Sequence, residues 1–208
     1  MGVVCVYPYQ VQSGKSSQQA LDILQKQVEQ LGAIKSGNYY VDCETFQSNL
    51  QNVAPKHVNI LHNSEQPASC FAVMDSGLCL VADALFDGLM QKIKNYYQPS
   101  KGAKIEVRGQ RYELGDFIIK TGSVMLTSSF KGILVEVEYG PCVVLGDCWN
   151  LLKELLQSII GNAAESPPPL LKSKMDATYT PSDTILQYLE HFSNCKKMAV
   201  TSPTAPSR

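Results

Sequence analysis

Two glutamates, two positions apart, have the clearest capacity for chemistry in this sequence. Glu136 and Glu138 lie in the segment ILVEVEY, in which apolar and other residues alternate as they do in a β-strand. Side chains two positions apart on a strand point to the same face, so the two carboxylates would lie side by side. Inside an antiparallel tunnel, such a pair can bind a divalent metal ion and a polyphosphate. The enzymatic hypothesis is therefore a metal-dependent, tunnel-type phosphohydrolase.

The same alternation has a simpler interpretation, which we favour. Ile133, Val135, Val137 and Tyr139 suit the core side of an amphipathic strand, which leaves Glu136 and Glu138 on its solvated side. No other set of residues completes a catalytic site. We therefore expect no catalytic residue, no cofactor and no metal ligand.

The sequence Ser13-Gly14-Lys15-Ser16 is similar to the end of a phosphate-binding loop. The full motif requires a glycine five residues before Gly14, but Tyr9 occupies that position. We predict a turn and a serine helix cap, with Lys15 in solvent.

His62 and Ser64 are too close along an extended strand to form a catalytic pair, and no glycine elbow presents the serine. We interpret residues 62–67 as the end of a strand followed by a loop.

Seven cysteines are scattered along the chain, mostly within apolar, strand-like segments. Their odd number and their setting favour free thiols in a reducing compartment. No pair has the spacing of a zinc knuckle, and His57, His62 and His191 are not placed to complete one.

The formal net charge of -1 gives no overall attraction to phosphates, so we expect no direct sequence-specific binding of nucleic acid. The apolar segments are shorter than the roughly 20 residues of a membrane span, and the start of the chain lacks the features of a secretory signal. We predict a soluble, intracellular protein.

The elements that must position these residues are mostly strands. Turn residues at Gly109, 121–122, 131–132 and 140–141 punctuate the block 104–149, a rhythm typical of an antiparallel sheet. Earlier strands are expected at 3–7, 39–46, 57–62, 69–74 and 78–81. Helices are expected at 16–31, from Asp83 to Tyr97, and from Asp147 to Ile160.

The expected domain organisation is a single β-barrel and helix domain at 1–161, then a proline-rich linker or arm at 162–179. A C-terminal helix follows at 180–195 and packs on the domain or on a partner. A disordered tail is expected at 196–208.

Several segments in fixed order resemble the Mediator subunit 20 family, also called the TBP-related-factor-proximal family. They are VDCETF at 41–46, HNSEQPASCF at 62–71, KIEVRGQRYELGDFIIKTGSV at 104–124 and GILVEVEYGPCVVLGDCWNLLKELLQS at 132–158, together with the MGV start and its SGKS helix. The resemblance implies an α+β fold, an incomplete antiparallel β-barrel flanked by helices. That fold is similar to Mediator subunit 18 and distantly to the triphosphatase tunnel.

The resemblance also implies a non-enzymatic, nuclear subunit of the Mediator head module that acts in transcription by RNA polymerase II. Its implied partners are subunit 18, in a heterodimer, a helix of subunit 8 at or near the dimer, other head subunits and the polymerase. Obligate pairs bury apolar patches with aromatic anchors. The residues expected at the partner interface are Phe117, Ile119, Tyr139, Val143 and Leu145.

Overall fold

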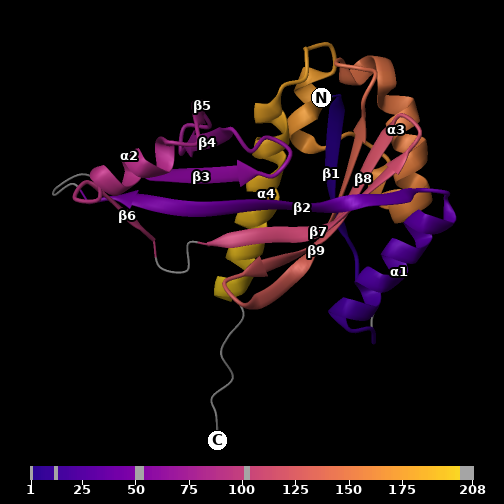
Figure 1. Cartoon of the computed structure of the whole chain (residues 1–208), viewed down its shortest axis with the longest axis horizontal. Coiled ribbons are helices and arrows are strands. Elements are labelled where there is room, and N and C mark those ends of the chain that lie inside the picture. Colours follow the sequence, from indigo (N-terminus) through magenta and orange to yellow (C-terminus); the bar gives the residue numbers. More distant parts are fainter. Residues whose placement is uncertain (1, 12–13, 50–53, 101–103, 202–208) are drawn as a thin grey trace, which may run out of the picture.

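The computed structural model of the chain (Figure 1) describes residues 2–11, 14–49, 54–100 and 104–201. Within these residues, nine strands form one antiparallel sheet in the order β1-β9-β8-β7-β2-β3-β4-β5, and β6 pairs with β2. The strands are β1 Val3–Tyr9, β2 Ile34–Ser48, β3 His57–Asn63, β4 Ser69–Met74, β5 Cys79–Asp83, β6 Tyr97–Pro99, β7 Ile105–Leu114, β8 Phe117–Leu126 and β9 Ser129–Tyr139. The expected α+β class with an incomplete antiparallel barrel is confirmed, because β1 and β5 end the sheet without pairing to each other.

The helices are α1 Ser17–Gln30, α2 Phe86–Lys92, α3 Leu145–Ile160 and α4 Pro181–Thr201, with short 3-10 turns η1 Gly161–Ala164 and η2 Pro169–Lys174. Among the described residues, no helix has both the length and the apolar character that a membrane span requires.

The long strand β2 joins the two halves of the sheet. Residues Ile34 to Cys43 pair with β7, and Val41 to Gln47 pair with β3. Figure 1 shows β2 crossing the molecule, with β3, β4, β5 and α2 toward one end and β1, β7, β8 and β9 toward the other.

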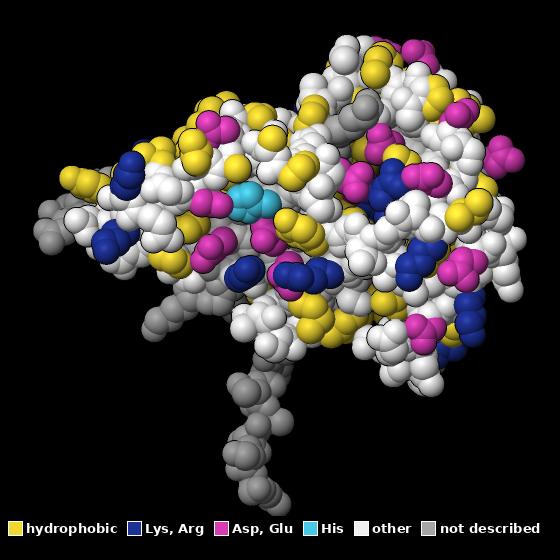
Figure 2. All heavy atoms as spheres, in the orientation of Figure 1, with side chains coloured by type: hydrophobic (Ala, Val, Ile, Leu, Met, Phe, Trp, Pro, Cys, Tyr) yellow, Lys and Arg dark blue, Asp and Glu magenta, His cyan; other side chains and the backbone are white. Residues whose placement is uncertain are grey.

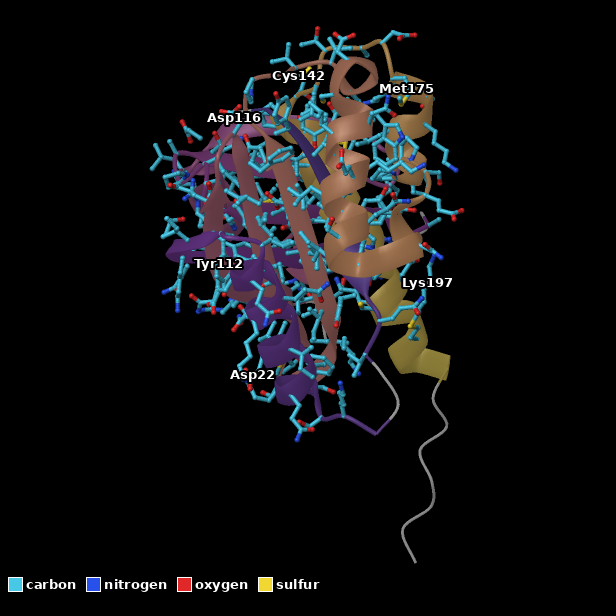
Figure 3. All side chains as sticks on the ribbon, turned by 90° about the vertical axis from the view of Figure 1, so that its right-hand side faces the viewer. Asp22, Tyr112, Asp116, Cys142, Met175 and Lys197 are labelled. Carbon is cyan, nitrogen blue, oxygen red and sulfur yellow. The ribbon has the colours of Figure 1, made fainter. Side chains whose placement is uncertain are left out.

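Helices α1 and α3 cover one face of the sheet. Leu24 and Val28 of α1 and Leu152 and Leu156 of α3 pack in one core with alternate residues of β1, β8 and β9. Figure 3 shows both helices lying along the strands, with Asp22 of α1 at the end of the sheet opposite Asp116 and Cys142. The expected core face of β9 is confirmed, since Ile133, Val135 and Val137 belong to this core.

Helix α4 covers the other face. Ile185, Tyr188 and Phe192 are fully buried in a second core. Its other members come from β1, β2, β3, β4, β7, β8 and β9, so the sheet curves around this one helix. The side of the sheet that would line a tunnel is therefore filled by α4. The polar side of β9 was predicted to be solvated, and that prediction is wrong, because α4 buries Leu134, Glu136 and Glu138.

The cap signals of α1 act as predicted. The Ser16 hydroxyl accepts a hydrogen bond from the Gln19 N–H at 3.2 Å, and the Gln19 side chain accepts one from the Ser16 N–H at 3.0 Å. Gly32 follows the last turn with a φ of 93°, the left-handed conformation that glycine adopts freely. Lys15 is exposed, as expected.

The free edge of β1 is covered by side chains of α4. The Gln187 amide bonds to the backbone of Val4 and Val6, and His191 Nε2 lies 3.1 Å from the Val6 carbonyl oxygen. The backbone groups that a neighbouring strand would occupy are thus satisfied within the chain.

The helix predicted from Asp83 to Tyr97 is wrong in extent. Asp83 ends β5, and its carboxylate accepts a hydrogen bond from the Leu85 N–H in a local turn. This turn delays the helix to Phe86. The helix ends at Lys92, because Tyr97–Pro99 joins β2 as β6.

The segment from Tyr139 to Leu145 joins β9 to α3. Strand β9 ends at Tyr139, a turn follows at Gly140-Pro141, and Leu145 begins α3 two residues before the predicted Asp147. A proline has no N–H to donate to a sheet, which explains the break.

Residues 162–179 were expected as a linker or arm, and they pack on the domain. Ala164 and Leu171 are buried in the core under α1 and α3. The Gly146 N–H donates to the Met175 carbonyl at 2.8 Å, and the Tyr179 N–H donates to the Val143 carbonyl at 2.7 Å. Helix α4 then packs on its own domain and continues beyond residue 195 to Thr201. The tail was predicted at 196–208, but residues 196–201 belong to α4, and residues 202–208 lie outside the described residues.

Candidate partner interface

The five residues predicted at the interface do not form one surface. Ile119 and Leu145 are fully buried in the core under α1 and α3. Phe117 and Tyr139 are half-buried and pack ring against ring, with centroids 4.9 Å apart. Val143 is 50% exposed in the turn before α3. Only the Phe117–Tyr139 pair and Val143 are therefore accessible to a partner.

A larger apolar surface lies at the opposite end of the sheet, where sequence reasoning did not predict one. We define the β5–α2 surface as Leu78, Leu80, Val81, Leu85 and Leu89, which are all exposed. Leu85, just before α2, is 80% exposed. Figure 2 shows apolar side chains gathered over the β4, β5 and α2 end of the molecule. A group of this kind marks a binding site more often than single exposed residues do.

The outer edge of β5 adds backbone groups to this surface. Leu80 and Val81 point to opposite faces of the strand, yet they are 41% and 59% exposed. Within the part of the chain that the structure describes, β4 is the single strand paired with β5. The two edges of the sheet thus differ, since β1 is covered by Gln187 and β5 is open to an added strand.

Glu136 lies inside the fold and is already paired. Its carboxylate Oε1 is 2.6 Å from Lys120 Nζ, and the Tyr188 hydroxyl donates a hydrogen bond to Oε2. Burial acts to lower the pKa of Lys120, but attraction to Glu136 and Glu65 outweighs it, so that pKa is raised. Burial is also the first cause of the strongly raised pKa of Tyr188. The lysine stays charged and the phenol stays neutral.

Glu138 is buried beside Glu136 and binds backbone. Its Oε1 accepts a hydrogen bond from the Gly2 N–H at 2.7 Å. Two arginines of β7 are paired as well, with Arg108 Nε 2.8 Å from Glu106 and Arg111 Nη1 2.5 Å from Glu113. With α4 in the lumen, these contacts leave the two carboxylates as structural groups.

A polar cluster missed by sequence reasoning surrounds His62. Its Nδ1 is 3.0 Å from Asp42 Oδ1, and its Nε2 is 3.2 Å from Asp87 Oδ2. The hydrogen bond to Asp42 is the main cause that raises the pKa of His62 to about 10. Ser64 does not approach this ring as a nucleophile, because its hydroxyl accepts a hydrogen bond from the Tyr40 N–H. The cluster depends on the register between neighbouring strands, and the residue pattern of a single strand does not contain that information.

All seven cysteines are free thiols, as predicted, and Cys5, Cys43, Cys70 and Cys148 are buried. Burial raises the pKa of Cys43 to about 11 and that of Cys148 to about 12, so these two thiols are protonated at neutral pH.

Comparison with known sequences gives a consistent result. Residues 1–193 match the family described as TATA-binding related factor (TRF) of subunit 20 of Mediator complex. The chain is similar to Mediator of RNA polymerase II transcription subunit 20 from Mus musculus, with 48% identity over 202 residues and 95% of each chain covered. The subunit from Anopheles gambiae is 49% identical over 213 residues, covering 96% of this chain and 97% of the relative. The human subunit is 46% identical over 202 residues and 95% of each chain.

Among solved structures, the PH1012 protein from Pyrococcus horikoshii aligns with 76% of this chain and 90% of its own. The TM-score is 0.45 and the sequence identity is 11%.

Proposed function

Because this chain belongs to the Mediator subunit 20 family, we propose that it is a component of the Mediator coactivator in transcription by RNA polymerase II. We propose further that it acts in the nucleus, in the head module, as a non-enzymatic subunit paired with subunit 18. The observation that carries the proposal is sequence identity of 46–49% with Mediator subunit 20 over nearly the full length of both chains. A helix of subunit 8 is proposed to bind at the dimer.

The β5–α2 surface is the contact that we propose for subunit 18. An exposed edge strand can extend the sheet of a partner through main-chain hydrogen bonds, and apolar side chains on both sides of it add buried area. Leu80 and Val81 lie on this edge, and Leu85 and Leu89 extend the apolar area along α2. Stable pairs bury roughly 800 Å² or more on each partner, so we propose that subunit 18 contacts both faces of this edge strand together with α2.

The accessible part of the predicted interface is a second proposed contact. Phe117 and Tyr139 pack together at the end of the sheet, and Val143 is exposed in the turn before α3, with Ile119 and Leu145 in the core beneath. This smaller group suits a neighbouring head subunit or the subunit 8 helix.

Two features support a non-enzymatic role. Glu136, the residue on which the phosphohydrolase hypothesis depended, is paired with Lys120 and Tyr188. Helix α4 occupies the side of the sheet where a tunnel would bind a polyphosphate.

Co-purification with tagged subunit 18 tests the interface. Val81→Glu combined with Leu85→Glu places charge on the β5–α2 surface, and we expect recovery of the dimer to fall at least tenfold, because the charges would be buried at the contact. Both residues are exposed, so the melting temperature of the isolated chain stays near that of the wild type.

Ile34→Glu is the matched control, since Ile34 is 73% exposed on β2, outside the β5–α2 surface. Val143→Glu examines the second contact in the same assay. The proposed interface would be wrong if the Val81/Leu85 variant still recovered subunit 18 fully while Ile34→Glu or Val143→Glu lost it. Failure of the wild-type chain to bind subunit 18 would contradict the heterodimer itself.

A further inference from the structure

Three side chains of metal-ligand type converge where β3, β4 and α2 meet. They are the imidazole of His62, the thiol of Cys70 and the carboxylate of Asp87, and one donor atom of each lies within 4.8 Å of the other two. Donors around a tetrahedral zinc ion, with bonds of about 2.0–2.3 Å, lie about 3.3–3.8 Å apart. The Asp87 side chain is largely exposed, so it can rotate to close this difference.

Strand register determines the position of the cluster. Asp42 is directly opposite His62 in the β2–β3 pair, and His62 is directly opposite Cys70 in the β3–β4 pair. The three side chains thus form a row across three adjacent strands on one face of the sheet. Met90 of α2 packs on the same face, and this contact brings Asp87 over the row.

Asp42 orients the imidazole. Its Oδ1 bonds to Nδ1 of His62 at 3.0 Å, which directs Nε2 toward Asp87 and Cys70. The Nε2 atom is shielded from solvent, and its neighbours are Asp87 Oδ2 at 3.2 Å and the Cys70 thiol. In metal sites, a carboxylate commonly holds the non-ligating nitrogen of a histidine in this way.

We propose that His62, Cys70 and Asp87 bind a zinc-class divalent cation, with Asp42 positioning the histidine. A mixed set of nitrogen, sulfur and oxygen donors suits zinc or cobalt, whereas magnesium and calcium prefer oxygen ligands alone. A pocket of about 480 Å³, which His62, Asp87 and Met90 line, adjoins the cluster, so water from this pocket would complete the coordination. The cation would tie α2 to the sheet beneath it. This site differs from the expectation of no metal ligand, because the three donors come from three separate elements.

Cobalt titration of the purified, EDTA-treated and reduced chain tests the site. We expect one Co²⁺ ion per chain and a thiolate-to-cobalt charge-transfer band in the near ultraviolet, both absent from Cys70→Ala. Zn²⁺ titration by calorimetry should show binding at least tenfold weaker in Asp87→Asn. It should be about 10- to 100-fold weaker in Asp42→Asn, the usual effect of losing a supporting carboxylate.

Two variants serve as controls. His57 is also paired with an aspartate, since its Nδ1 lies 3.4 Å from Asp75 Oδ2, but it is not a member of the His62–Cys70–Asp87 cluster. His57→Ala should therefore bind the metal as the wild type does. Cys142→Ala removes a partly accessible thiol outside the cluster and should keep the charge-transfer band.

If Cys70→Ala does not fold, Asp87→Asn tests the metal site instead, because a change at the exposed Asp87 should not affect folding. A stoichiometric cobalt complex without a charge-transfer band, or equal zinc affinity in the wild type and Asp87→Asn, would overturn the site. This outcome is independent of co-purification with subunit 18, so the two proposals fail separately.

Discussion

Lys120 and Glu136 form an ion pair inside the fold, on neighbouring strands β8 and β9. Lys120 Nζ lies 2.6 Å from Glu136 Oε1, and the two side chains are 2% and 1% exposed. The residues are direct partners in the strand register, and Tyr188 of α4 bonds to the second carboxylate oxygen. The carboxylate that gave the sequence its enzymatic hypothesis therefore joins the sheet to α4.

Loss of one member of this pair should be costly. Lys120→Met leaves Glu136 buried without its cation, and we expect a loss of about 3–5 kcal/mol in the free energy of unfolding. The double variant Lys120→Met/Glu136→Gln removes both charges and keeps an acceptor for Tyr188, so it should recover most of that loss. Urea unfolding measures both variants. Lys26→Met, at an exposed position on α1, is the control, and equal stability of the single and double variants would contradict the pairing.

Gln187 should be essential to the covered edge of β1. Its Oε1 accepts from the Val6 N–H at 3.0 Å, and its Nε2 donates to the Val4 carbonyl at 3.1 Å. Gln187→Leu leaves these buried groups unpaired, at a cost of about 1–3 kcal/mol. Hydrogen exchange at the Val6 amide should become faster.

Gln27→Leu is the control for this prediction, because Gln27 makes a comparable hydrogen bond to the Ser158 carbonyl at an exposed position. Unchanged exchange at Val6 in Gln187→Leu would show that another group protects the edge.

Gly109 is a position where a side chain cannot be accommodated. A Cβ atom there would lie 1.9 Å from the Thr121 carbonyl oxygen on β8, so β7 and β8 would have to separate. We expect Gly109→Ala to lower stability by about 1–3 kcal/mol, the typical cost of overpacking. In Gly132→Ala, the new methyl group meets open space, so thermal unfolding should differ little from the wild type. Similar melting temperatures for both variants would contradict the close approach.

Asp183 should contribute an acid-sensitive part of the stability. Burial acts to raise its pKa, but hydrogen bonds from Lys174 and Thr180 outweigh burial and leave the pKa lowered. A carboxyl with a lowered pKa in the folded state stabilises fully above the ordinary aspartate pKa of about 3.9. That contribution is lost as the pH falls through the lower folded-state pKa.

The measurement is chemical unfolding from pH 6 down to about pH 3, below the ordinary aspartate pKa. Asp183→Asn should be less stable than the wild type at pH 6, and the difference should shrink toward the acid end of the series. Asp22→Asn, an exposed change on α1, controls for general effects of acid. A constant difference across the series would mean that the Asp183 charge does not contribute.

The candidate surface could be predicted from the sequence only in part. Phe117, Tyr139 and Val143 are accessible, but Ile119 and Leu145 are buried. Ile119 lies further along β8 than Phe117, inside the core under α1 and α3, and the early start of α3 places Leu145 in the same core. Leu80 and Val81 looked like an ordinary apolar strand. Their exposure depends on β5 being the last strand of the sheet, which is a property of strand order.

Local patterns in the sequence determined the elements themselves. The period of two in β9, the Ser16 cap and Gly32 at the end of α1 act through contacts within a few residues, so the chain segment alone contains them. Only the tertiary structure decided what covers each face. The α4 helix begins more than forty residues after Glu136, and its packing turned a predicted solvated face into a core. The pairing of β2, β3 and β4 likewise placed Asp42, His62 and Cys70 in one row, because register is a relation between strands.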